Sequence, residues 1–286
     1  MPPPERRPGR SGAAGQPGRS NPAGRDRPAP DRARDRREGA GRPPTDRGAT
    51  RQRPAGPHDD RRPRPAEPPL PEDLPPAELD RDARAELRSL PTSLAERVTS
   101  HLLAAGLLLD DDPAAAHAHA WYARSLAPRL AIVREAAGIT AYRTGEFAAA
   151  IAELRAVRRM TGDPSHLPIL ADAERGLGRP ERALAFAKDP DVAKLDPAAR
   201  VELAIVVSGA RRDRGENEAA VVGLQGHALD SDRLQPWTAR LWYAYAEALL
   251  AADRVDEARR WFDSVAAVDD DAETDAADRA ASLPPD

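Results

Sequence analysis

The feature that most constrains the fold is a turn residue that recurs at a near-constant spacing. Asp111, Gly145, Gly178, Gly215 and Asp253 are separated by 34, 33, 37 and 38 residues. A period of about 20 to 50 residues is typical of chains that stack one supersecondary unit on the next. The spacing therefore predicts consecutive units of one kind, and we number each unit so that the turn is its position 15.

Two columns of small residues accompany the turns. Position 8 holds a small residue in every unit, and position 20 holds alanine. Two antiparallel helices joined by a short turn pack closely only where neither carries a bulky side chain at the crossing point. The columns therefore predict helical hairpins. The position-8 residues are Ala104, Gly138, Ala171, Ser208 and Ala246, and the position-20 residues are Ala116, Ala150, Ala183, Ala220 and Ala258.

Capping and proline signals predict where individual helices begin and end. Ser93 and Glu96 have the spacing of a capping box, which predicts a helix start. Asp112 precedes Pro113, an order typical of an N-cap followed by the first helical residue. Pro190 is expected to end the second helix of the third unit early, because proline cannot continue the helical hydrogen bonds.

The second and fifth units carry the most complete set of packing residues; they read AGITAYRTGEFAAAIAEL and RLWYAYAEALLAADRVDEARRWF. Both resemble the tetratricopeptide repeat family. The matching residues are Gly138, Gly145, Phe147, Ala150 and Leu154 in the second unit, and Trp242, Tyr245, Ala246, Leu249, Ala258 and Phe262 in the fifth. The resemblance implies an all-α fold, a right-handed α-solenoid of about five helical hairpins over residues 94–271. The third and fourth units depart from it, since Glu174 and Arg211 occupy usually apolar positions.

The composition changes sharply near residue 70. Residues 1–70 hold 16 of the 30 prolines and 17 arginines, but no lysine. Low hydrophobicity combined with high proline, glycine and charge predicts a disordered tail. Residues 71–93 are expected to be a linker and a leading helix that Pro91 ends, and residues 272–286 a C-terminal cap or tail.

The tail and the rest of the chain carry opposite charge. The tail has 17 arginines against nine acidic residues, whereas the remainder has 26 basic and 38 acidic residues. A basic arm suits nucleic acid or an acidic protein surface, and it also permits the tail to lie back on its own body. An arginine- and proline-rich start followed by such repeats resembles uncharacterised tetratricopeptide repeat proteins of actinobacteria, which implies no activity.

Features that bear on the compartment point to the cytoplasm. The chain has no cysteine, so a disulfide framework and a thiolate zinc site are excluded. Met1 is followed by a Pro/Arg/Gly run instead of the apolar segment of a signal peptide. The longest apolar stretch, residues 102–109, is far shorter than the roughly 20 residues of a membrane span. We therefore expect a cytoplasmic protein without a membrane partner.

The search for chemistry finds no catalytic pattern. His117 and His119 resemble metal ligands, but residues two apart on a helix point about 200° from one another and cannot share an ion. The acidic run at residues 269–271 lacks the glycine and distal glutamate of a calcium loop. Phosphate-binding loops, dinucleotide fingerprints and nucleophile elbows do not occur in the sequence. We therefore expect no metal, no cofactor and no enzymatic activity.

The surface expected to bind a partner comes from the first helix of each unit, which lines the concave side of stacked hairpins. Its lining mixes aromatic, apolar and oppositely charged residues, which suits a peptide or a helix better than a polyanion. The Lys/Asn/Arg clamp that one branch of the family uses for a terminal carboxylate is not present in the sequence. The candidate groove residues are His101, Glu135, Ile139, Tyr142, Arg175, Arg212, Arg240, Tyr243 and Glu247.

Two functions are consistent with these observations. The first is an adaptor or scaffold that binds a segment of a partner protein in the groove, the partner's identity being open. The second is a nucleic-acid-associated protein that uses the arginine-rich tail, with the repeats as an assembly module. Interspersed acidic residues and the absence of aromatic residues in the tail weaken the second hypothesis. A helical enzyme is a third and less favoured reading.

Overall fold

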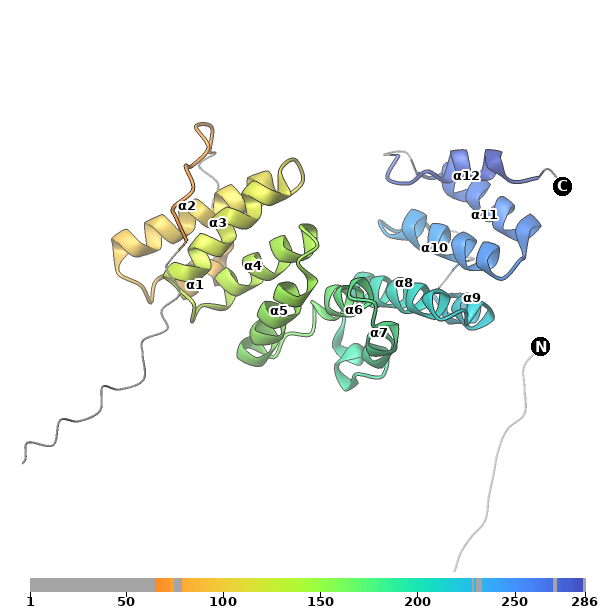
Figure 1. The fold of residues 1–286 in the computed structure, drawn as a ribbon, viewed down its shortest axis with the longest axis horizontal. Coiled ribbons are helices and arrows are strands. Elements are labelled where there is room, and N and C mark those ends of the chain that lie inside the picture. Colours follow the sequence, from red (N-terminus) through yellow and green to blue (C-terminus); the bar gives the residue numbers. More distant parts are fainter. Residues whose placement is uncertain (1–64, 75–78, 228, 230–232, 270–271, 285–286) are drawn as a thin grey trace, which may run out of the picture. The chain divides into compact units, whose positions relative to one another are not determined.

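The computed structural model describes residues 65–74, 79–227, 229, 233–269 and 272–284 (Figure 1). The chain divides into two units, residues 1–58 and 59–286, and every described residue belongs to the second unit. Residues 1–64 of the predicted tail lie outside the described residues. The described residues form helices, turns and loops with no strand among them, which confirms the predicted all-α class.

The helices follow one another as pairs joined by turns. The pairs are α2 (Thr92–Leu108) with α3 (Pro113–Leu126), α4 (Ala131–Arg143) with α5 (Phe147–Thr161), α6 (Leu167–Gly176) with α7 (Pro180–Phe186), α8 (Pro197–Asp213) with α9 (Asn217–Gln225), and α10 (Thr238–Ala251) with α11 (Val255–Ala266). α1 (Arg81–Leu87) precedes them, α12 (Ala276–Ser282) follows them, and the 3-10 helix η1 (Pro190–Lys194) separates α7 from α8. Each pair packs on the next in chain order.

Four of the predicted turn residues adopt the left-handed conformation. The φ angles are 78° at Gly145, 70° at Gly178, 73° at Gly215 and 61° at Asp253. Because a left-handed residue redirects the chain immediately after a helix, it permits the short return to the next helix. Asp111 is different: its φ is not positive, and the first hairpin turns through residues 109–112 without a left-handed residue.

The same substitution at two glycines is expected to have opposite effects. Gly145→Ala should destabilise the fold by about 1–2 kcal/mol, because an alanine at φ 78° brings its Cβ against the following carbonyl oxygen. Gly106→Ala in helix α2 should stabilise it by about 0.5–1 kcal/mol, because alanine loses less conformational entropy than glycine on folding and the added Cβ would meet no atom within 4 Å outside the adjoining helix backbone. Urea unfolding of both variants measures the change in the free energy of unfolding. A destabilised Gly106→Ala variant would contradict the placement of Gly106 at an uncrowded position of helix α2.

The small-residue columns are buried throughout. All five position-20 alanines have no exposed surface, and the position-8 residues are buried as well. At Gly138 a Cβ would lie only 2.7 Å from the Leu154 side chain of α5. The column therefore has the steric origin inferred from the sequence: the helices of a hairpin approach too closely there for a larger side chain.

The local signals were right at two helix ends and wrong at one. Asp112 caps α3 by accepting a hydrogen bond from the Ala115 backbone N–H at 2.9 Å, and α7 ends at Phe186, ahead of Pro190. The capping box at Ser93 is wrong. Helix α2 begins at Thr92 with Pro91 as its N-cap, and no side chain caps it. The extended ψ of 142° at the proline already provides the entry geometry, so the serine falls inside the helix.

A buried carboxylate joins the first two hairpins. Glu153 on α5 is only 4% exposed, yet it accepts hydrogen bonds at 2.6 Å from Arg124 on α3 and from Arg134 on α4. Each carboxylate oxygen therefore has its own guanidinium donor. The pairing explains how a charged residue can lie inside the packing between these helices.

A second buried carboxylate explains one departure from the repeat pattern. Glu174 on α6 is 1% exposed and takes a position that is usually apolar. Arg155 on α5 donates a hydrogen bond to it at 2.8 Å, and Arg179 and Arg182 lie at 3.5 and 3.8 Å from its other oxygen. The three guanidinium groups satisfy the charge that the position would otherwise leave unpaired.

Candidate partner-binding face

The candidate groove residues from the second hairpin onward form a row of polar contacts between successive first helices. We call the surface that they make on α4, α6, α8 and α10 the first-helix face. Most of its links join one first helix to the next, and the others join α10 to the residue that precedes α12 or α4 to the residue that precedes α6. The links are Glu135 with His166 at 3.0 Å, Tyr142 with Asp172 at 2.6 Å, Arg175 with Asp213 at 2.6 Å, Arg212 with Glu247 at 2.8 Å, Arg240 with Glu202 at 2.7 Å and Tyr243 with Asp275 at 2.6 Å.

The phenols on this face act as hydrogen-bond donors. Burial and the hydrogen bond to Asp172 raise the pKa of Tyr142 well above its usual range. Burial and the hydrogen bond to Asp275 raise the pKa of Tyr243 to about 12. Both hydroxyls therefore stay protonated at neutral pH and donate to a carboxylate, Asp172 on α6 or Asp275 just before α12. The face is rich in tyrosine and arginine, the residue types that dominate binding hot spots.

The candidate groove residues differ in accessibility. Ile139 is half-buried beside the apolar cluster of the second and third hairpins, and Arg240 keeps 51% of its side chain exposed despite its ion pair. Glu247 is also contacted by Arg279 of α12, so two guanidinium groups share this carboxylate. The structure therefore brings the row together, and most of its charges have partners within the chain.

His101 does not lie on the accessible surface. Its side chain has no exposed area, and its Nδ1 lies 2.8 Å from Nδ1 of His119 on α3. Its Nε2 faces Oε1 of Glu67 at 3.3 Å. The chain's own segment at residues 65–74 thus covers the residue that the sequence had placed in the groove.

Glu67 is a residue that the sequence reasoning missed. Besides His101, its carboxylate accepts a hydrogen bond from the Tyr122 hydroxyl at 2.8 Å and lies 4.0 Å from Nε of Arg97. These contacts, the Tyr122 hydrogen bond first, hold the pKa of the Glu67 carboxyl below its usual range. No sequence motif links a residue in a proline-rich segment to partners more than 25 positions away, so no local signal predicted the contact.

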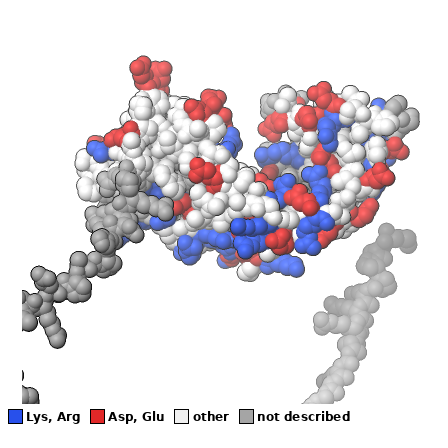
Figure 2. All heavy atoms as spheres, in the orientation of Figure 1, with Lys and Arg blue, Asp and Glu red and all other residues white. Residues whose placement is uncertain are grey.

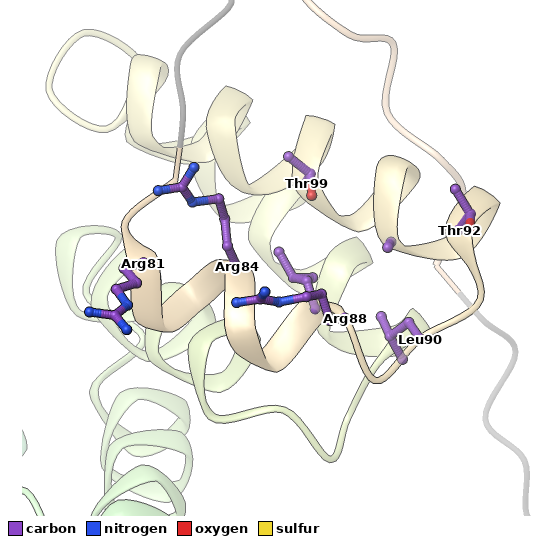
Figure 3. Close-up of a pocket in the computed structure, with 8 residues that line it drawn as sticks. Arg81, Arg84, Arg88, Leu90, Thr92 and Thr99 are labelled. Carbon is purple, nitrogen blue, oxygen red and sulfur yellow. The ribbon is translucent and has the colours of Figure 1, made fainter.

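A cavity lies between α1 and α2 (Figure 3). It has a volume of about 710 Å³ and combines guanidinium groups from α1 with hydroxyls from α2 over an apolar floor. Such a lining suits an anionic group with an apolar body. The spacing of three and four residues between the arginines was a signal that sequence reasoning passed over. The lining residues are Arg81, Arg84, Leu87, Arg88, Leu90, Thr92, Ala95 and Thr99.

Basic side chains also gather on one part of the surface. Figure 2 shows lysine and arginine side chains concentrated over α5 to α8. Exposed basic residues of these elements and their connections include Arg159 on α5, Arg182 on α7 and Lys188 after α7. The acidic body therefore carries a local basic area, which favours an acidic partner surface there.

Metal-ligating residues do not converge. Within the described ranges, no group of three or more His, Asp or Glu residues is placed to hold a metal ion. His117 Nδ1 lies 3.0 Å from the Thr140 hydroxyl while His119 faces His101, so the two imidazoles diverge as their spacing predicted. Asp269 accepts backbone hydrogen bonds from Glu273 and Thr274, and residues 270–271 lie outside the described residues.

Membrane insertion has no support from the helices in the described part of the chain, none of which combines the length and apolar character of a bilayer span. In comparisons with known proteins, the chain matches no protein-family model and no curated protein sequence.

Acidification is expected to weaken the fold through His119. Burial, followed by the nearby His101, holds the pKa of His119 below its ordinary value of 6.5. The unfolded chain therefore takes up this proton at a higher pH than the folded chain, so the stability from His119 is present above pH 6.5 and declines as the pH falls below it. Tyr122 and Glu67 also face this histidine pair.

The test compares urea unfolding of the wild type and His119→Gln between pH 7 and pH 5. We expect a shallower pH dependence in the variant, by up to about 1.4 kcal/mol per pH unit for one proton. Equal slopes in the two proteins would show that His119 does not titrate differently on folding.

Proposed function

We propose that this chain is a protein-interaction module, a right-handed α-solenoid of the tetratricopeptide type that binds a segment of a partner protein. The observation that carries the proposal is the first-helix face, where hydrogen bonds link α4 to α6, α6 to α8, α8 to α10 and α10 to the residue that precedes α12. Stacked hairpins present the same helix of each unit to one side, and such a side is a long surface for an extended or helical ligand.

The chemistry of the face favours a protein ligand. Tyr142 and Tyr243 provide aromatic surface, Ile139 provides an apolar contact, and the charged residues of the face include both arginine and glutamate. A polyanion would meet the carboxylates of Glu135 and Glu247 on the same face, which repel it. A peptide that carries both apolar anchors and charges of either sign matches the mixture better.

The paired charges of the face set a condition on the ligand. Arg175 and Arg212 already bond to carboxylates of neighbouring helices, so a partner gains little by competing for a single guanidinium group. Its affinity has to come from the aromatic and apolar positions, with the charged row fixing direction and register.

Site-specific photocrosslinking in the native cell tests the proposal. A photoreactive amino acid is placed at Ile139 or Arg240 on the first-helix face, and in controls at Met160 or Val222, which are 46% and 63% exposed on the second helices α5 and α9. We expect discrete protein adducts from the first two positions and none from the control positions. Equal adducts at all four positions, or none at Ile139 and Arg240, would contradict a partner on this face.

The alternative function, binding of nucleic acid by the arginine-rich tail, concerns residues 1–64, which lie outside the described residues. Its support is the tail's excess of arginine over acidic residues. Binding of RNA and DNA by the full chain and by a chain that lacks residues 1–64 is compared over a range of salt concentrations. Tail-dependent, salt-sensitive affinity would favour this function, and equal affinity of the two chains would exclude it.

A further inference from the structure

Residues 65–74 form an irregular segment that contacts the first hairpin through the carboxylate of Glu67. The segment reads PAEPPLPEDL and contains no helix or strand. Its prolines at positions 65, 68, 69 and 71 favour an extended backbone. Glu67 meets the Tyr122 hydroxyl of α3 and Nε2 of His101 of α2, at 2.8 and 3.3 Å. The side chain of one glutamate therefore joins the segment to both helices of the first hairpin.

The hydrogen-bond arrangement fixes which groups donate to that glutamate. Because the Glu67 carboxyl has a lowered pKa, it is ionised at neutral pH and can only accept. The proton at the His101–Glu67 contact must then reside on Nε2 of His101. In the neutral form of His101, its Nδ1 accepts from Nδ1 of His119, 2.8 Å away. The histidine pair therefore holds one N–H directed at the carboxylate.

The two side chains that donate to Glu67 are buried, whereas the Glu67 side chain is half exposed. His101 has no exposed surface and Tyr122 only 5%, whereas the Glu67 side chain is 50% exposed. Arg97 adds positive charge at 4.0 Å from the carboxylate and is itself 54% exposed. The donors thus belong to the packed hairpin, while the carboxylate that they hold lies at the surface, from where it can leave without opening the core.

We propose that Arg97, His101 and Tyr122 form a carboxylate-binding site for a glutamate in a proline-rich extended segment, which Glu67 occupies in cis and a partner segment of the same chemistry occupies in trans. The proposal deepens the proposed function and rests on it, because it supplies one partner class for the first hairpin. An occupant tethered to its own site competes at a high effective concentration. Glu67 therefore keeps the site closed to weak or non-matching segments.

A labelled peptide with the sequence of residues 65–74 tests the site by fluorescence anisotropy. Its binding is measured to the full chain as wild type, as Glu67→Ala and as Glu72→Ala. Glu72 lies in the same segment and is exposed, so its removal is the matched control. We expect Glu67→Ala to bind the peptide about tenfold or more tightly than the other two proteins, the gain from removing one charge-assisted hydrogen-bonded competitor.

Two further measurements distinguish specific recognition of the peptide from nonspecific binding. Tyr122→Phe in the Glu67→Ala chain removes one hydroxyl donor and should lower the affinity for the peptide by about tenfold. A peptide with glutamine in place of its Glu67 should lose affinity for the Glu67→Ala chain to a similar degree. Circular dichroism checks that each variant keeps its helices. Absent binding to Glu67→Ala, equal binding to all three proteins, or insensitivity to Tyr122→Phe would each overturn the site.

The outcomes also distinguish this site from the broader function. Photocrosslinks at Ile139 and Arg240 report on the second and fifth hairpins, whereas the peptide reports on the first. Peptide binding without those crosslinks would leave the carboxylate site standing and the first-helix face without a partner. Crosslinks without peptide binding would support a partner on the first-helix face and overturn the carboxylate site.

Discussion

Phe262→Ala is expected to lower the free energy of unfolding by about 3–5 kcal/mol, the range for removing a fully buried aromatic side chain. Phe262 has no exposed surface and lies in the apolar cluster built from α8 to α12. Its ring meets Tyr243 edge-on at 5.4 Å, and the Arg279 guanidinium lies 5.5 Å from its centroid. The substitution therefore leaves a cavity and removes two ring contacts together.

Urea and thermal unfolding measure this loss, with Val222→Ala as the control. Val222 is 63% exposed, so its truncation should change the stability by no more than about 0.5 kcal/mol. Because Phe262 supports Tyr243 on the first-helix face, Phe262→Ala should also reduce any crosslink obtained at Arg240. A loss below about 1 kcal/mol would mean that the last hairpin collapses around the cavity or that the ring is not packed as described.

The parts of the fold that the sequence predicted are those set by local steric rules. A left-handed turn residue needs glycine or a short polar side chain, and Gly145, Gly178 and Gly215 meet that need. The alanine column works in the same way, because a close helix crossing excludes larger side chains whatever surrounds it. Asp111 shows the limit: aspartate is compatible with several turn conformations, so its identity did not determine the backbone there.

The parts that could not be predicted depend on contacts between different hairpins. Glu174 departs from the repeat pattern in the sequence, and the approach of α5 and α7 provides the arginines that permit its burial. Similarly, His101 occupies a groove position in the repeat numbering, but residues 65–74 cover it. The sequence records which side chains are polar, whereas the relative placement of the hairpins decides which carboxylate meets which guanidinium group.

The first-helix face has one feature that could be predicted from the sequence and one that could not. The repeat numbering correctly grouped Tyr142, Arg175 and Arg212 on neighbouring helices, because residues at equal positions of successive units lie near each other when the units stack. It did not predict that each would bond to the first helix of the next hairpin. These bonds give the face a structural role beside the proposed binding role. Substitutions that test binding are therefore best placed at Ile139 and at Arg240, whose side chain stays 51% exposed despite its ion pair with Glu202.

Removing both guanidinium partners of Glu153 is expected to cost about 3–5 kcal/mol of stability, because a buried carboxylate is then left without a counter-charge. The change is Arg124→Met combined with Arg134→Met, since methionine keeps an unbranched apolar stem in place of each arginine. Glu153 is 4% exposed and takes one 2.6 Å hydrogen bond from each arginine, so either single variant leaves one partner and should cost clearly less. Urea unfolding of the two single variants and the double variant measures the coupling.

Replacing the carboxylate itself distinguishes an unpaired charge from lost packing. Glu153→Met in the double-variant background removes the buried charge and should restore more than half of the lost stability, because an apolar residue needs no partner at that position. If the loss came instead from missing arginine contacts with α3 and α4, the triple variant would be no more stable than the double variant.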